Sequence, residues 1–392
     1  FTLLTRVSKK SRELQLFREK KVPPGRKKTV TSFDVASRAR VSRATVSFVL
    51  NGVSEAKISE RTRTRVLKAA RDLGYFPDAA GKALARRKTE NIALVYTQSY
   101  HHLACHAIIP RLIDGLMRVA HERNLRLMID SVEEGTSGTN LLALARANHI
   151  DGLIMLEPRT GDRQLLALAK DRFPMVLIGT LPGVDLCSID IDNREAARRV
   201  VEHLISLGHT RIGCITNAPL HFTAATARLT GYQDALRAHG IPFRRSLVRY
   251  GGFNPESGRV AMKSMLRQRS LPSAVFIASD EVALGALRAI AEAGLRVPDD
   301  IALFGFDNIV DSRYASPPLA TVSFPVEEHG RRSAEILFEL MNGRISPPYQ
   351  ETTPFELILR ESCAAPRPRG ATQRQLASSS NWKDNQSEEV YV

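Results

Sequence analysis

From Asn91 onward, short apolar runs alternate with longer segments in which apolar residues recur every three or four positions. The short runs predict buried β-strands, and the longer segments predict amphipathic helices. This alternation is typical of a mostly parallel, doubly wound sheet with helices on both faces. Because about 270 residues are too many for one compact sheet, we expect two similar α/β lobes. The expected strands are Ile92–Tyr96, Leu125–Ile129, Gly152–Leu156, Met175–Ile178, Ile212–Thr216, Ala274–Ala278 and Ile301–Phe304.

Three short helical patterns precede this body. Thr31 can cap a first helix, and Ser42, which follows a short turn, can cap a second helix that runs to Leu50. A third helix is expected from about Ser59. Two short helices across a tight turn, braced by a third, predict a helix-turn-helix whose second helix enters the major groove of DNA. An ordinary three-helix cap packed on the body is the alternative.

Positive charge is concentrated at the N-terminal end of the chain. The formal net charge is +15, and residues 1–90, with 23 Lys or Arg and eight Asp or Glu, carry all of it. Residues 91–392 contain 33 residues of each sign. A basic segment in front of a neutral body indicates a polyanionic partner, nucleic acid before any other. On charge alone, an arm that only keeps the chain in solution is the alternative.

Several classes of protein are excluded by what the sequence lacks. The four cysteines form no Cys-x-x-Cys pair, which indicates reduced thiols rather than a zinc ribbon. No membrane-spanning apolar run and no secretory signal are present, so we expect a cytoplasmic, nucleoid-associated protein without a membrane partner. No strand leads into a hydrolase, phosphate-binding or dinucleotide motif, so we expect neither an enzyme nor a cofactor. His102 and His106 could share a helix face, but without a distal partner motif we expect no metal.

The N-terminal helices carry a specific series of residues. In order, these are Thr31-x-x-Asp34-Val35-Ala36, Ala39-x-Val41-Ser42-x-Ala44-Thr45-Val46-Ser47-x-Val49-Leu50-Asn51 and Leu73-Gly74-Tyr75-x-Pro77. With these motifs the chain closely resembles the lactose/galactose repressor (LacI/GalR) family, from about Thr31 to Ser362. The resemblance implies a homodimeric transcription regulator, a repressor, whose affinity for a pseudo-palindromic operator in double-stranded DNA changes with a small effector such as a sugar. A solute-binding protein of a transport system is the alternative, because the body also resembles periplasmic sugar binders.

The resemblance places DNA contacts on the first two helices. The candidate contact residues there are Thr31, Ser42, Arg43, Ala44, Thr45, Ser47, Phe48 and Asn51. Two positions depart from the family pattern. Arg40 replaces the usual glycine of the turn, so it must adopt a left-handed or adjusted conformation at some cost. Phe48 replaces a frequent arginine and can make only apolar contact, for instance with a thymine methyl group, which leaves Arg43 to read base edges.

The segment 77–90 resembles the hinge helix of the family. A helix this short is not stable alone, so we expect it to order only when two copies meet on DNA. The resemblance makes Leu84 the apolar wedge that enters a base step from the minor groove and bends the duplex. Lys82 and Arg86 are candidates for further DNA contacts in this segment. A plain linker is the alternative.

The effector is expected between the two lobes, because ligands of open α/β sheets bind beyond the carboxyl ends of the strands. Candidate effector ligands are Arg228, Phe253, Asp280 and Asp307. Arginine and aspartate can hold vicinal hydroxyl groups, and an aromatic ring can cover the apolar face of a sugar. The resemblance supports each of these positions. For Asp280 a helix N-cap stays open as the alternative, and Asp192 and Asn193 are expected to be cap and turn residues.

The predicted fold is therefore a small all-α helix-turn-helix head and a two-lobed, periplasmic-binding-protein-like α/β body with doubly wound parallel sheets. The expected division is a flexible basic arm (1–28), the helix-turn-helix domain (29–76), a hinge helix or linker (77–90), an effector-binding and dimerisation domain (91–363) and a disordered tail (364–392).

Overall fold

The computed structural model describes residues 30–51, 57–76, 88–98, 102, 106–132 and 140–366. The chain divides into two compact units between Arg87 and Lys88. We call the described parts of these units the head (30–76) and the body (88–366), and each is described by itself. The elements are α2 (Ser32–Ala39), α3 (Arg43–Leu50) and α4 (Glu60–Leu73) in the head, and β1 (Asn91–Tyr96), α7 (Ile109–Glu122), β2 (Arg126–Ser131), α8 (Leu141–Arg146), β3 (Gly152–Leu156), α9 (Arg163–Lys170), β4 (Met175–Ile178), β5 (Cys187–Ile191), α10 (Asn193–Ser206), β6 (Ile212–Thr216), α11 (Thr223–Ala238), the 3₁₀ turn η1 (Arg245–Leu247), β7 (Val248–Tyr250), α12 (Pro255–Leu266), β8 (Ala274–Ile277), α13 (Asp280–Glu292), β9 (Ala302–Phe304), α14 (Val310–Tyr314), β10 (Thr321–Ser323), α15 (Val326–Met341), β11 (Tyr349–Thr353) and β12 (Glu356–Ile358) in the body.

The head consists of the three expected helices around one small core. Thr31 caps α2 in a capping box with Asp34, whose carboxylate accepts hydrogen bonds from the Thr31 backbone N–H and hydroxyl at 2.8 Å each. Ser42 caps α3 by accepting from the Thr45 backbone N–H at 3.1 Å. The core is formed by the apolar faces of the three helices, with Val35, Ala36, Ala39, Val46, Val49, Val66, Ala69 and Ala70 buried.

The turn between α2 and α3 is made at Arg40. Its backbone has φ 50° and ψ 54°, the left-handed conformation expected where the family pattern has glycine. The Arg40 N–H donates to the Ser37 carbonyl oxygen, and the Val41 N–H donates to the Ala36 carbonyl oxygen. These hydrogen bonds satisfy the last carbonyl groups of α2 although the arginine side chain disfavours the left-handed conformation.

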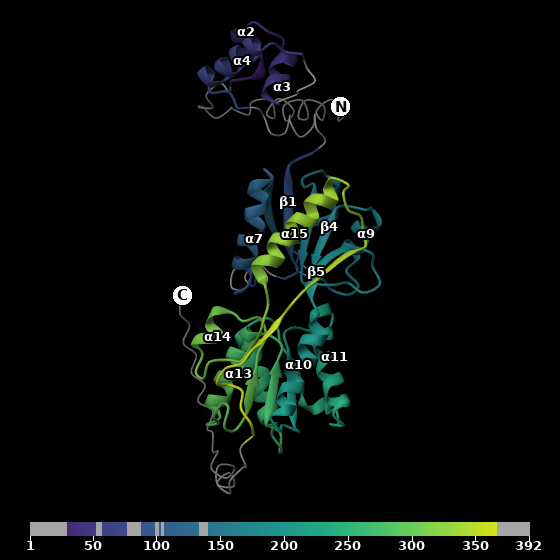
Figure 1. Cartoon of the computed structure of the whole chain (residues 1–392), viewed down its shortest axis with the longest axis vertical. Coiled ribbons are helices and arrows are strands. Elements are labelled where there is room, and N and C mark those ends of the chain that lie inside the picture. The colour runs from purple at the N-terminus through teal and green to yellow at the C-terminus, as the bar shows by residue number, and fades with distance from the viewer. Residues whose placement is uncertain are drawn as a thin grey trace, which may run out of the picture. The chain divides into compact units, whose positions relative to one another are not determined.

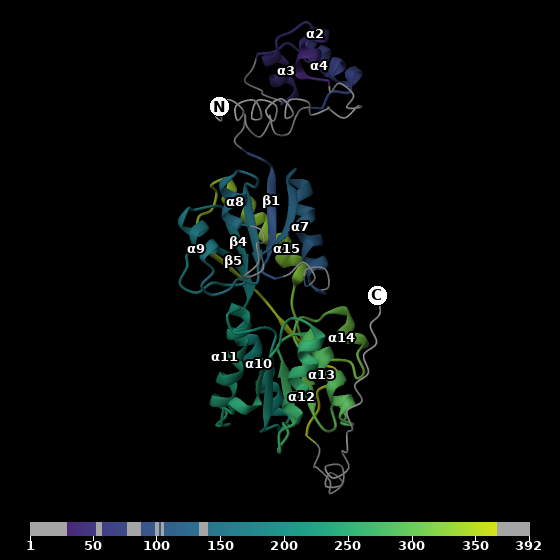
Figure 2. The same ribbon diagram turned by 180° about the vertical axis from the view of Figure 1, so that it is seen from behind.

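The body contains two parallel sheets, one in each lobe (Figures 1 and 2). The first lobe has the strand order β11-β5-β4-β3-β1-β2, and the second has β7-β6-β8-β9, with every pair in both sheets parallel. All seven expected strands are present, with ends that differ by at most two residues. The two-lobed α/β prediction is confirmed.

The chain passes between the lobes three times. β5 belongs to the first sheet, whereas α10, which follows directly, packs on α11 of the second lobe. After β10 the chain returns as α15, which packs on α7, and as β11, which pairs with β5. β12 then pairs antiparallel with β10. Side chains beyond the carboxyl ends of strands from both sheets consequently line one region between the lobes. Among the described residues, no helix is both long and apolar enough to cross a membrane.

Candidate functional site

A cavity with about 540 Å³ of empty space, part of it open to solvent, lies where the two lobes meet. Glu157 follows β3 and Asp190 lies in β5, so the first lobe supplies two carboxylates. Asn217 follows β6 and Asp307 follows β9 in the second lobe. Each of these side chains lines the cavity.

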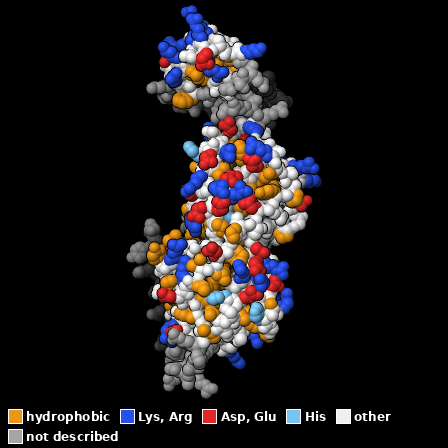
Figure 3. All heavy atoms as spheres, in the orientation of Figure 1, with side chains coloured by type: hydrophobic (Ala, Val, Ile, Leu, Met, Phe, Trp, Pro, Cys, Tyr) orange, Lys and Arg blue, Asp and Glu red, His pale blue; other side chains and the backbone are white. Residues whose placement is uncertain are grey.

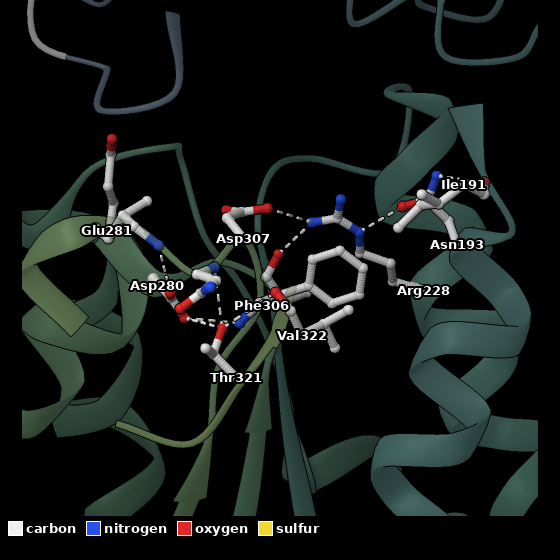
Figure 4. A network of polar contacts seen from close by, with 12 residues as sticks. Ile191, Asn193, Arg228, Asp280, Glu281, Phe306, Asp307, Thr321 and Val322 are labelled. Carbon is white, nitrogen blue, oxygen red and sulfur yellow. Dashed lines mark hydrogen bonds and ion pairs between the residues drawn. The ribbon is translucent and has the colours of Figure 1, made fainter. Parts of the chain in front are cut away.

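Arg228 is the central cation of this cavity (Figure 4). Its Nε donates to Asn193 Oδ1 at 2.8 Å, and its Nη1 donates to the Ala278 carbonyl oxygen at 2.6 Å. The guanidinium lies over the Phe306 ring, with Cζ 3.6 Å from the ring centroid, and Nη1 is 3.8 Å from Asp307 Oδ1. These contacts hold the plane of the guanidinium in one orientation within the cavity.

The sequence predicts that Arg228 starts the helix leading to Gly231 and Tyr232. Helix α11 begins earlier, at Thr223, so Arg228 lies in its second turn. Close packing of α11 against α10 requires Gly231, since a Cβ at that position would overlap the Arg194 carbonyl oxygen.

Two other sequence candidates, Phe253 and Asp307, also line the cavity. The Phe253 ring packs edge-on against Phe222, with centroids 4.9 Å apart. Phe253, Asp307 and the cavity-lining Glu157 have φ values of 59°, 108° and 57°. Such conformations cost non-glycine residues free energy and persist where the surroundings enforce them, as binding sites often do.

Asp280 is placed differently from the effector contact expected from the sequence. Its side chain is fully buried and accepts hydrogen bonds from the Phe306 and Ile309 backbone N–H groups and from the Thr321 hydroxyl (Figure 4). Ser279, and not Asp280, is the N-cap residue of α13. The Asp280 carboxylate therefore supports the loop that carries Asp307 and is not among the side chains lining the cavity.

Four lining residues were missed as ligands in the sequence analysis. Glu157 and Asn217 follow expected strands, so the rule that selected Asp307 would have selected them as well. Asp190 and Asn193 were missed because the strand β5 was not expected. Asn193, expected as a cap or turn residue, donates from Nδ2 to Asp190 at 2.9 Å and accepts from Arg228, whereas Asp192 does cap α10.

Burial dominates the electrostatics of the cavity. It raises the pKa of Glu157 to about 8 and that of Asp190 to about 7. It also raises the pKa of Asp307 to about 6, against the opposing effect of the Arg228 charge. For His106, burial lowers the pKa to about 4, so the imidazole is neutral at pH 7. Carboxylates thus outnumber the cation in a region where charge is poorly solvated.

The two histidines considered as metal ligands, His102 and His106, line cavities of the body. His106 lines the Arg228 cavity, and a second cavity next to it is lined by both His102 and His106 together with Glu281. Within the described ranges, no group of three or more His, Cys, Asp or Glu side chains is arranged to hold a metal ion.

The helix α3 presents a mixed surface on the head. Arg43, Ala44, Ser47 and Phe48 are exposed, as the apolar pattern predicts, while Thr45 is half-buried. Asn51 donates from Nδ2 to the Ser47 hydroxyl at 3.1 Å, and Thr31 stays exposed at the α2 cap. Figure 3 shows Lys and Arg side chains prominent on the visible part of the head, whereas both signs intermingle on the visible face of the body. The hinge candidates Lys82, Leu84 and Arg86 lie outside the described residues.

Comparison with known proteins assigns both units. Residues 33–78 match the model of bacterial regulatory proteins of the lacI family, and residues 201–363 match that of a periplasmic binding protein-like domain. The transcriptional regulator CelR of Thermobifida fusca is 33% identical over 84% of this chain and 96% of its own length. The transcriptional repressor CytR of Escherichia coli (strain K12) is 34% identical over 86% and 96%, respectively.

Solved structures agree with this assignment. A lac repressor dimer bound to operator and the anti-inducer ONPF has a TM-score of 0.74 and 30% identity, with 86% of this chain and 100% of that chain covered. A CelR–cellobiose complex has a TM-score of 0.67 and 32% identity, with 85% and 99% covered.

A helix-turn-helix head joined to a periplasmic-binding-protein-like body defines a DNA-binding transcriptional regulator. The chain belongs to the LacI family of bacterial regulatory proteins. The family consists of regulators and not of enzymes, which confirms that expectation from the sequence. The transport-protein alternative is set aside because residues 33–78 form the DNA-binding head of this family.

Proposed function

We propose that this regulator is a repressor that binds a pseudo-palindromic operator as a homodimer and changes its operator affinity when a small polyhydroxylated effector, a carbohydrate or related metabolite, occupies the Arg228 cavity. The observation that carries the proposal is the cavity itself, whose side chains come from both lobes. A ligand that contacts both lobes favours one arrangement of the lobes over another. Such a preference is the thermodynamic basis of an allosteric response.

The donors and acceptors of the cavity suit a polyol. Arg228 and Asp307 form an ion pair in which Nη1 lies 3.8 Å from Oδ1. Together they can bind two vicinal hydroxyl groups of a ligand. Phe253 supplies an apolar surface beside them. The cellobiose bound by the similar CelR supports a carbohydrate as the effector class.

On the operator, we assign base contacts to the exposed residues of α3 and phosphate contacts to the ends of the helices capped by Thr31 and Ser42. The hinge segment, with Leu84 as the wedge and Lys82 and Arg86 beside it, completes the interface in the proposal. Residues 1–28 act as a non-specific basic arm. This function places the protein in the cytoplasm, at the nucleoid.

Exposed apolar side chains support a homodimer. Met117 of α7, Val260 of α12 and Tyr314 of α14 are 47%, 56% and 81% exposed. Figures 1 and 2 place α7 and α14 on the same side of the body. Large exposed apolar residues favour a protein–protein interface, and the similar lac repressor is a dimer on its operator.

The proposal is tested by selecting operators from a random double-stranded DNA library with the full chain. We expect selected sites with two inverted half-sites and an affinity that falls steeply as salt rises. Arg43→Ala should weaken specific binding by about 1–3 kcal/mol if it reads a base. Arg71→Ala, in the last turn of α4, serves as the matched control.

Leu84→Ala should reduce specific binding more than non-specific binding, because only specific sites are bent by the wedge. Sites without inverted symmetry, or equal losses for both kinds of DNA, would contradict the operator part of the proposal.

A further inference from the structure

The ionisable groups of the Arg228 cavity are mostly acidic. Glu157, Asp190 and Asp307 contribute three carboxylates, against the single guanidinium of Arg228. Asn217 is only 5% exposed, and its Oδ1 has no hydrogen-bond partner. A buried acceptor without a partner costs free energy until a donor arrives, so a ligand that donates to Asn217 Oδ1 is favoured.

Glu157 faces Gln98, His106 and the Tyr96 hydroxyl of β1 rather than a directly paired cation. Gln98 donates to it from Nε2 at 3.4 Å, and His106 Nε2 lies 3.9 Å away. Because the His106 imidazole is neutral at pH 7, it does not balance the carboxylate charge. In the part of the chain that the structure describes, neither lysine nor arginine lies within 4.0 Å of Glu157.

Other elements around Glu157 add further negative charge. Asp307, after β9, and Glu281, in α13, both repel its ionised form, and Arg228 in α11 is the opposing charge. The undescribed residues 99–101 and 103–105, which follow β1, read Ser-Tyr-His and Leu-Ala-Cys and include neither lysine nor arginine. Glu157 is nevertheless held at φ 57°, where glycine or asparagine would cost less. A carboxylate kept there at this cost indicates a role for the side chain.

We propose that the natural effector carries a protonated amine beside its hydroxyl groups, as an amino sugar does, and that Glu157 binds this amine. The inference rests on the proposed function, since it concerns the same cavity. An ammonium group supplies three donors and no acceptor, which suits the acidic lining. Its positive charge also favours the ionised form of Glu157, whose pKa is about 8 in the ligand-free protein, so the ammonium and the carboxylate can form an ion pair between the lobes. Anionic ligands such as uronic acids are excluded by the same charges.

The proposal is tested with the full chain and matched sugars. Glucose, galactose, mannose and cellobiose are each compared with their 2-amino and N-acetylated forms, and the three monosaccharides with their uronic acids, by thermal shift followed by calorimetric Kd measurement. We expect an amino form to raise Tm more than its neutral parent does. N-acetylation, which removes the charge and keeps the scaffold, should weaken binding at least tenfold, and the uronic acids should not bind.

Two variants test whether Glu157 causes the preference for the amino form. Glu157→Gln keeps the shape of the side chain and should weaken binding of the amino form at least tenfold more than binding of the neutral parent. Glu351→Gln removes a half-buried carboxylate of β11 outside the cavity and should change neither. For the wild type, affinity for the amino form should rise between pH 6 and pH 8 as Glu157 ionises, and Glu157→Gln should flatten this dependence.

A panel in which no amino form exceeds its neutral parent overturns the inference, as does a Glu157→Gln variant that binds the amino form unchanged. Operator binding measured on the same samples separates this failure from that of the proposed function. If a neutral sugar changes operator affinity, effector control stands and the amine is wrong. If no compound of any charge changes it, effector control itself fails.

Discussion

Phe48 restricts which DNA sequences the head can recognise more than any other exposed residue of α3 does. Its side chain is 42% exposed and has no donor or acceptor, so its contribution to recognition is burial of apolar surface, such as a thymine methyl group. Replacing thymine by deoxyuridine, position by position in a selected operator, removes only that methyl group. We expect one position per half-site where the replacement weakens wild-type binding about fourfold, the equivalent of about 0.8 kcal/mol for one buried methyl group.

Phe48→Ala should lose this dependence on the methyl group. Phe33→Ala, which removes an exposed phenylalanine from α2, is the matched control and should keep it. If every thymine can be replaced without effect on the wild type, Phe48 does not read a methyl group.

Glu157 also links the stability of the ligand-free protein to pH. Burial raises its pKa from the ordinary 4.5 to about 8, so the folded state binds the proton more tightly than the unfolded state. The unfolded chain therefore releases this proton first, and the free energy of unfolding falls as pH rises from about 4.5 to 8. Glu157→Gln should raise Tm relative to the wild type at pH 8 by several degrees and leave it unchanged near pH 4.5. An equal difference at both pH values, measured by calorimetry, would show that the carboxyl group is not responsible.

Among the structural elements, the α2–α3 turn has the clearest cost in conformational free energy. Arg40 is left-handed, a conformation that costs a side chain about 1–2 kcal/mol and glycine none. Arg40→Gly should therefore stabilise the head by about 0.5–1 kcal/mol, after the larger backbone entropy of glycine in the unfolded chain is deducted. Hydrogen exchange of the α2 and α3 amides in the full chain measures this gain.

Arg38→Gly, inside α2, is the control and should destabilise the head by about 1 kcal/mol. Slower exchange in Arg40→Gly combined with faster exchange in Arg38→Gly is the expected pair of results. Faster exchange in both would mean that the arginine side chain holds the turn.

The strands show which elements a sequence can reveal. Buried central strands such as Gly152–Leu156 are continuous apolar runs, and their ends were predicted without error. β11 reads Tyr-Gln-Glu-Thr-Thr at a sheet edge, and β10 and β12 have three residues each, so none has an apolar run to detect. In β5 the polar Ser188 and Asp190 interrupt the pattern. Missing β5 also hid Asp190 and Asn193. Asp307 was predicted because it follows an expected strand, and Arg228 because the family resemblance supports its position in a helix.

For the whole molecule, the division of charge corresponds to the division of function. The described head carries nine Lys or Arg and three Asp or Glu, whereas residues 91–392 are neutral overall. In the body, three acidic side chains and Arg228 line one cavity between the lobes. Recognition of a polyanion and recognition of a small molecule are thus separated along the chain. Effector control therefore requires that ligand binding in the body changes the DNA affinity of the head.

Operator affinity measured with and without ligand tests this linkage most directly. The Kd of the full chain for its selected operator is determined at a ligand concentration that saturates the thermal shift, for the wild type and for Arg228→Ala. We expect a change of at least tenfold in the wild type and none in Arg228→Ala, which should still bind the operator. A ligand that saturates the body and leaves the wild-type operator Kd unchanged would rule out effector control of DNA binding.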